Sequence, residues 1–167
     1  MKASLISPRR ARRQKFDSLA QEAYLSLWRT YDRLKALEDD LFGRHDLSAQ
    51  QYNALRLLRS AHPGTLPTLA LGARLVSRAP DMTRLLDKLE QRGLVHRQRR
   101  TSNRRVVEIG ITGEGLALLE DLASQVRDCH QRQLGHLSDR ALRELIAGLA
   151  AARRPHEEPA TVWPQPS

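Results

Sequence analysis

Five arginines lie within residues 97–105, and their side chains suit the binding of a polyanion. They are Arg97, Arg99, Arg100, Arg104 and Arg105. A guanidinium group stays charged at neutral pH and donates hydrogen bonds in a planar fork that matches phosphate oxygens and the edge of guanine. The type and spacing of these residues therefore indicate nucleic-acid binding rather than catalysis.

The net charge of +9 is concentrated in two segments. Residues 1–15 carry a net charge of +6, residues 78–105 carry another +6, and the remainder of the chain sums to −3. Concentrated positive charge favours binding to a polyanion because each neutralised phosphate releases condensed counterions. The alternative is that the arginine-rich segments serve only solubility.

Residues that build catalytic and metal sites do not occur in the required patterns. The six histidines lack metal-ligand spacing, and the single cysteine, Cys129, excludes an internal disulfide and a cysteine-based zinc site. The segment "GITGEG" lacks the lysine of a phosphate-binding loop, and the chain has no G-x-S-x-G motif. We therefore expect no enzyme activity, no metal and no cofactor. Cys129 beside His130 suggests a redox switch, but we expect a buried or half-buried structural cysteine.

The sequence also argues against a membrane partner. No apolar run approaches the roughly 20 residues needed to cross a bilayer. The basic N-terminal segment lacks the apolar region typical of a secretory signal. We expect a cytoplasmic protein.

Hydrophobic spacing predicts the helices that must position the arginines. A long helix runs from Phe16 to about residue 43, and a second starts at Ser48, which forms a capping box with Gln51. A short third helix covers about 66–75. A fourth starts at Ser77 as N-cap, with Pro80 in its first turn, and ends at Gly93. Its inward-facing residues are Met82, Leu85, Leu86 and Leu89.

Two strands follow the fourth helix, at 94–98 and 106–111, joined by an arginine-rich turn. Thr112 and Ser138 are expected to cap two further helices. This order of elements predicts a mainly α fold with a small β-hairpin (α+β), arranged as a winged helix-turn-helix. Residues 1–14 are expected to form a basic flexible arm, 15–152 the winged-helix domain, and 153–167 a disordered tail.

Two stretches at the right spacing carry a family resemblance. "MTRLLDKLEQRGLVHR" and "NRRVVEIGITGEGLALL" resemble the recognition helix and the wing of the MarR family of bacterial transcriptional regulators. The sequence departs from the family pattern at Asn103, where aspartate is usual, and at "SRAPDMTR", where small hydroxyl residues are more common.

The resemblance implies a homodimer with dimerisation helices at about 15–43 and 112–152 and a DNA-binding lobe at about 48–111. It further implies a repressor of transcription, bound to double-stranded DNA at a pseudo-palindromic operator and released by a small-molecule effector, phenolic or similar. Two alternatives remain open: a winged helix used as a protein-interaction module, and a nonspecific DNA-binding protein.

The expected DNA-binding residues come from the fourth helix and the hairpin. Arg84 is expected to read a base and Lys88 to contact a phosphate. Asp81 either accepts a hydrogen bond from cytosine or stabilises the first turn of its helix. The complete set is Ser77, Arg78, Asp81, Thr83, Arg84, Lys88, Arg99, Arg100, Asn103, Arg104 and Arg105.

Three further assignments have alternatives. The resemblance implies that Asp87 orients the wing by pairing with Arg105, whereas a partner on its own helix, Arg84 or Arg92, is the alternative. The basic arm either enters a minor groove or adds only nonspecific affinity. Four aromatic residues either line a ligand cleft or form part of the core, which their helical spacing favours; they are Tyr24, Trp28, Tyr31 and Tyr52.

Overall fold

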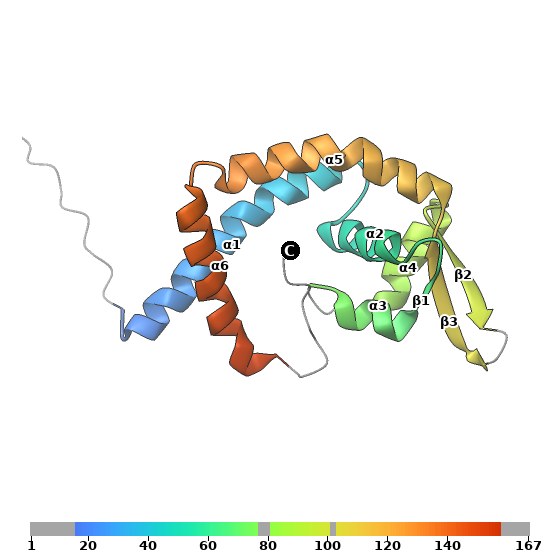
Figure 1. Cartoon of the computed structure of the whole chain (residues 1–167), viewed down its shortest axis with the longest axis horizontal. Coiled ribbons are helices and arrows are strands. Elements are labelled where there is room, and N and C mark those ends of the chain that lie inside the picture. The colour runs from blue at the N-terminus through green and yellow to red at the C-terminus, as the bar shows by residue number, and fades with distance from the viewer. Residues whose placement is uncertain (1–15, 77–80, 101–102, 158–167) are drawn as a thin grey trace, which may run out of the picture. The chain divides into compact units, whose positions relative to one another are not determined.

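The computed structural model describes residues 16–76, 81–100 and 103–157, which form helices and a small sheet (Figure 1). For Arg100 and Asn103–Arg105 it describes the backbone alone. The chain divides into two units, residues 1–35 and 36–167, which are considered separately below. The expected basic arm and most of the expected tail lie outside the described residues, although Arg154–His156 form a short 3-10 helix (η1).

The first unit contains the beginning of α1 (Leu19–Gly43). The helix starts three residues later than expected from Phe16, because the Ser18 hydroxyl accepts a hydrogen bond from the Gln21 amide and so caps it. The Tyr24 and Trp28 rings lie 6.2 Å apart on this helix, and both are well exposed.

The second unit holds the remaining helices, and the starts of three of them follow the capping rules predicted from the sequence. Ser48 caps α2 in a complete capping box with Gln51, Thr112 caps α5 and Ser138 caps α6, which confirms the predictions for these residues. The helices are α2 (Ala49–Ala61), α3 (Thr68–Arg74), α4 (Met82–Gln91), α5 (Gly113–Leu134) and α6 (Asp139–Arg153).

The sheet has a third strand that the sequence did not reveal. β1 (Leu66–Pro67) pairs antiparallel with β3 (Asn103–Ile111), which pairs with β2 (Val95–Arg100) in the order β1-β3-β2. The prediction of helix from residue 66 was therefore wrong by two residues. Leu66 is buried in the sheet opposite Ile109, and the Thr68 hydroxyl donates to the Val107 carbonyl at 3.1 Å, so α3 begins beside the sheet.

The strands of the hairpin are longer than expected. Pairing runs from Val95↔Ile111 to Arg100↔Asn103, so Arg99 and Arg100 lie on β2 rather than in a turn. A shift of register separates Arg99↔Val107 from Arg100↔Asn103, which leaves residues 104–106 of β3 without partners in the β2 register. Such a bulge depends on pairing between strands, which no local pattern specifies.

Leucine side chains fill the core of the second unit. Helices α2, α3 and α4 lie beside the sheet, and α5 contacts α2 (Figure 1). Full burial of each leucine contributes about 1.5–3 kcal/mol. The most buried large side chains are Leu55, Leu58, Leu71, Leu86, Leu89, Ile109, Leu119 and Leu122.

The start of α5 packs very closely against Leu94, the residue before β2. A Cβ atom added to Gly115 would lie 2.3 Å from the Leu94 carbonyl oxygen, so this position requires glycine. Closer to the C-terminus, α6 has no buried residue in the described chain. None of the described helices combines the length and apolar character needed to span a membrane.

Candidate nucleic-acid interface

Helix α4 presents one polar and one apolar side. Leu85, Leu86 and Leu89 are buried, whereas the side chains of Arg84, Lys88 and Gln91 follow one another at helical spacing on the exposed side. Thr83 is also exposed. The helix therefore holds a basic surface strip in place by burying its opposite face.

Asp81, not Ser77, is the N-cap of α4. Its carboxylate accepts a hydrogen bond from the Arg84 amide at 2.8 Å, and the helix begins at Met82. The prediction of Ser77 as N-cap was wrong. Proline disfavours helical geometry in the residue before it, so Pro80 opposes a helix that would start at residue 78. The capping contact supports the structural interpretation of Asp81; Ser77 and Arg78 themselves lie outside the described residues.

The guanidinium of Arg97 connects β2 to the side of α4. Its Nη1 lies 2.6 Å from an Asp87 carboxylate oxygen and 3.4 Å from one of Glu90, while Nη2 donates to the Thr83 carbonyl at 3.3 Å. The Arg97 side chain is 26% exposed. One of the five hairpin arginines is thus engaged with the helix rather than directed to solvent.

Asp87 pairs with the hairpin, but through a residue that was not foreseen. Among the described side chains its ionic partner is Arg97 on β2, and not Arg84 or Arg92 of its own helix. The pairing with Arg105 that the resemblance implies stays a prediction, because the structure describes only the backbone of Arg105. Sequence spacing could not find Arg97, because the contact joins elements whose approach depends on the tertiary fold.

The remaining hairpin arginines occupy the outer part of the wing. Arg99 is exposed on β2, on the same face of the strand as Arg97. Asn103 is the backbone partner of Arg100 at the tip, and Arg104 and Arg105 fall within the unpaired stretch of β3. The backbone therefore places four arginines in the outer half of the hairpin.

The aromatic residues do not form a core in the described chain. Tyr24, Trp28 and Tyr31 are 64%, 60% and 60% exposed, so the interpretation of these three as core residues was wrong for a single chain. Only Tyr52 packs inside, with its ring 4.5 Å from that of Phe42. Sequence spacing identified an apolar stripe correctly but could not show that nothing from the same unit covers it.

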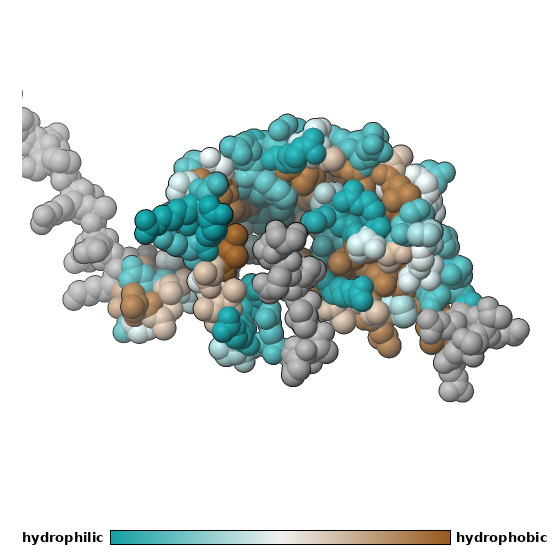
Figure 2. Space-filling model, viewed as in Figure 1, coloured by the Kyte–Doolittle hydropathy of each residue, from teal (hydrophilic) through white to brown (hydrophobic). Residues whose placement is uncertain are grey.

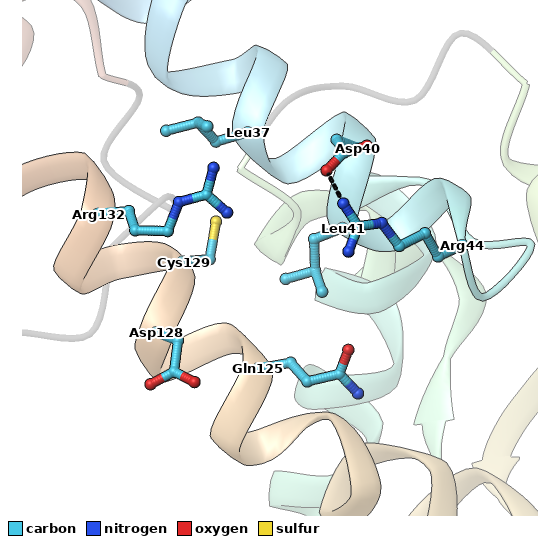
Figure 3. A pocket seen from close by; sticks show the side chains of 8 residues that line it. All are labelled: Leu37, Asp40, Leu41, Arg44, Gln125, Asp128, Cys129 and Arg132. Atoms are coloured by element: carbon cyan, nitrogen blue, oxygen red, sulfur yellow. Dashed lines mark hydrogen bonds and ion pairs between the residues drawn. The ribbon is translucent and has the colours of Figure 1, made fainter.

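A shallow pocket lies instead between the end of α1 and α5 (Figure 3). Arg44 and Asp40 form an ion pair at its rim, and the Arg132 guanidinium lies beside the Cys129 sulfur. Burial raises the pKa of the Cys129 thiol, as does the Glu38 carboxylate, whereas Arg132 lowers it. Cys129 is buried, as expected, and its protonated thiol is a weak nucleophile.

Comparison with known proteins connects this geometry to a family. A model of the MarR family matches residues 47–107. The crystal structure of a MarR transcription factor from Planctomyces limnophilus shares 58% sequence identity, covers 82% of this chain and 99% of its own, and superimposes with a TM-score of 0.65. The chain belongs to the MarR family.

Other MarR-type proteins agree with this assignment. The HTH-type transcriptional regulator FarR of Neisseria gonorrhoeae is 31% identical over 113 residues, which span 66% of this chain and 76% of FarR. A mutant MarR from E. coli, solved in complex with operator DNA, shares the fold with a TM-score of 0.71 at 23% identity, over 81% of this chain and 99% of that chain.

Membership of the MarR family establishes the coarse function. The chain is a transcriptional regulator with a DNA-binding winged-helix fold, and members of this family are not enzymes. The predicted fold class is confirmed, with the addition of β1. Within the described residues, no group of three or more histidine, cysteine, aspartate or glutamate side chains is placed to bind a metal ion.

Proposed function

We propose that this MarR-family protein is a homodimeric repressor that binds a pseudo-palindromic operator and is released by a small-molecule effector. The observation that carries the proposal is the contact of Arg97 with Asp87 and Glu90, because it sets the basic strip of α4 beside the arginine-rich hairpin. A helix and a wing held at a fixed angle can contact the major and the minor groove of one duplex together.

In this proposal α4 reads the major groove. Arg84 has the donors to pair with guanine, Thr83 contacts a base or a phosphate, and Lys88 contacts a phosphate. Gln91 extends the same exposed strip and can pair with adenine, although its residue type alone did not single it out. Ser77 and Arg78 remain proposed contacts before the helix.

The wing is proposed to reach the adjacent minor groove. Arg99 contributes an exposed guanidinium near the tip of β2, and the backbone places Arg100, Arg104 and Arg105 in the same outer half of the hairpin. Arginine enters narrow, A·T-rich minor grooves because their electrostatic potential is the most negative. Asn103 at the tip is proposed to contact the backbone of the DNA.

The homodimer would cover apolar side chains that each unit leaves exposed. In the first unit these are Leu27, Trp28 and Tyr31 of α1. In the second they are Leu145 and Ile146 of α6, and Figure 2 shows hydrophobic residues at the surface along this helix. Contiguous exposed apolar side chains are typical of an interface with another chain.

The proposed effector is a small phenolic or similar molecule. Tyr24, Trp28 and Tyr31 are exposed in the single chain, and at the proposed dimer interface their rings would offer aromatic surface to a phenolic ligand; Tyr52 lies in the other unit, stacked on Phe42. Aromatic lining suits a planar apolar ligand. An effector that binds the DNA-free state more tightly must weaken operator binding by the same factor, by reciprocal linkage.

Fluorescence anisotropy tests the proposal. The full chain is titrated against the intergenic DNA upstream of its own gene and against a scrambled duplex of equal length, at two salt concentrations. A repressor should prefer the native fragment about 10³-fold or more and lose affinity steeply as salt rises. Equal binding to both duplexes would support nonspecific binding, and no binding at low salt would support a protein-interaction module.

A further inference from the structure

The recognition helix α4 ends in a defined backbone motif. Leu94 N donates to the Leu89 carbonyl at 3.0 Å, and Gly93 N donates to the Glu90 carbonyl at 2.8 Å. Gly93 has a left-handed backbone with φ of +68°, as predicted for the residue that ends this helix. This is a Schellman motif, which reverses the chain and satisfies the last carbonyl groups of the helix.

Helix α1 ends in the same motif without glycine at the turning position. Leu47 N donates to the Phe42 carbonyl at 3.0 Å, and Asp46 N donates to the Gly43 carbonyl at 3.2 Å. Asp46 takes the left-handed position with φ of +51°, where glycine is usual. Phe42 and Leu47 are both buried, so the motif is anchored in the core.

Arg92 connects these two helix ends. It is the C-cap residue of α4, and its Nη1 donates to the backbone carbonyl of Asp46 at 2.7 Å. The next contact leads to α5, since the His45 Nε2 and the Gln125 Oε1 lie 3.1 Å apart. The loop after α1 is therefore bonded to the end of the recognition helix on one side and to α5 on the other.

The geometry points to Arg92 as a positioning residue for α4 and not as a phosphate ligand, although it belongs to the basic segment 78–105. The inference rests on the proposed function, because α4 reads an operator only if the chain binds one. The hydrogen bond to Asp46 sets the C-terminal end of α4 relative to the C-terminal end of α1, which the proposal makes a dimerisation helix. Sequence-specific contacts require supporting residues of this kind, since small displacements of a recognition element weaken them.

Arg92→Ala separates positioning from phosphate binding. Loss of the hydrogen bond lowers operator affinity about threefold to tenfold, while affinity for a scrambled duplex and the dependence of log K on log salt stay unchanged. Loss of a phosphate contact instead weakens both duplexes alike and reduces the salt slope by about one unit, which would overturn the inference. Arg127→Ala, at an exposed arginine of α5, is the matched control.

Hydrogen exchange on the free protein gives a readout that needs no DNA. The amides of Asp46 and Leu47 exchange faster in Arg92→Ala than in the wild type and in Arg127→Ala, because the loop has lost its bond to α4. Equal rates would overturn the inference.

Asp46→Asn keeps the backbone carbonyl that accepts from Arg92, so this variant should bind the operator as tightly as the wild type does. A loss of operator affinity equal to that of Arg92→Ala would show that the Asp46 carboxylate, and not its carbonyl, matters, and would overturn the inference. If the wild type itself shows no operator preference, the proposed function fails, and the exchange rates still decide the role of the Arg92 bond.

Discussion

The guanidinium of Arg97 lies 2.6 Å from the carboxylate of Asp87, and this ion pair joins the hairpin to α4. The same guanidinium also reaches Glu90 and the Thr83 carbonyl. One side chain of β2 therefore contacts α4 along most of its length. Among the described side chains, Arg97 is therefore the hairpin arginine whose ionic contacts hold the hairpin against the helix.

Arg97→Ala should lower the affinity for the operator, relative to a scrambled duplex, by a larger free energy than it lowers the free energy of unfolding. The ion pair is partly exposed, so we expect a loss of about 0.5–1 kcal/mol in the free energy of unfolding, measured by urea denaturation. A double-mutant cycle with Asp87→Asn should show coupling of similar size in both unfolding and operator binding. Additive effects of the two substitutions would contradict a shared role in orientation.

Arg84 and Lys88 should differ in how their loss affects binding. Arg84→Ala should cost about 1–3 kcal/mol on the operator and relax specificity at one base position, whereas Lys88→Ala should weaken all duplexes and lower the salt slope by about one unit. Anisotropy on the operator and on single-base variants measures both effects. Uniform weakening of every duplex by Arg84→Ala would remove it as a base reader.

Ile146→Asp should convert the proposed dimer to monomers. Ile146 is exposed on α6, so a charge there leaves the described core intact but opposes burial against a second chain. Sedimentation velocity should show half the wild-type mass, with lower operator affinity. Arg143→Gln, at another exposed position of α6, is the control and should remain dimeric. A dimer that persists in Ile146→Asp would place the interface elsewhere.

The stability of the protein should fall at high pH through Cys129. Burial raises the pKa of this thiol above its ordinary value of 9.0, so the folded state binds the proton more tightly than the unfolded state does. The resulting stabilisation is complete below pH 9 and is lost as the pH rises through the raised value. Between pH 7 and 10, the free energy of unfolding measured with urea should therefore fall more steeply in the wild type than in Cys129→Ala. Parallel curves would show that the thiol does not contribute.

Gly115→Ala should destabilise the second unit by about 1–3 kcal/mol, the usual cost of overpacking. The added methyl group would meet the Leu94 carbonyl at 2.3 Å. Gly113→Ala is a matched control two residues away, where nothing lies within 4 Å of the added carbon. Thermal denaturation should show a lower Tm for the first variant and an unchanged or slightly higher Tm for the second. Equal Tm values for both variants would mean that the start of α5 can shift away from Leu94.

Features with a local cause were predictable from the sequence. The capping box of α2, the hydroxyl caps of α5 and α6 and the left-handed Gly93 depend on residues a few positions apart. Features that depend on tertiary approach were not: the pairing of Leu66 with Ile109, the register shift beyond Arg99 and the choice of Arg97 as partner of Asp87. The exposed tyrosines of α1 show the same limit, since spacing reveals an apolar stripe but not what covers it.

Both edges of the sheet are poor templates for a foreign strand. β1 has only two residues, and its Pro67 has no amide hydrogen to donate. β2, the other edge, carries Arg99 and Arg100, whose charges repel a second copy of the same strand. The residues proposed to hold DNA would therefore also keep the protein from aggregating by edge-to-edge association while no DNA is bound. Replacing the arginines of the wing with neutral residues should then lower the solubility of the DNA-free protein as well as its affinity for DNA.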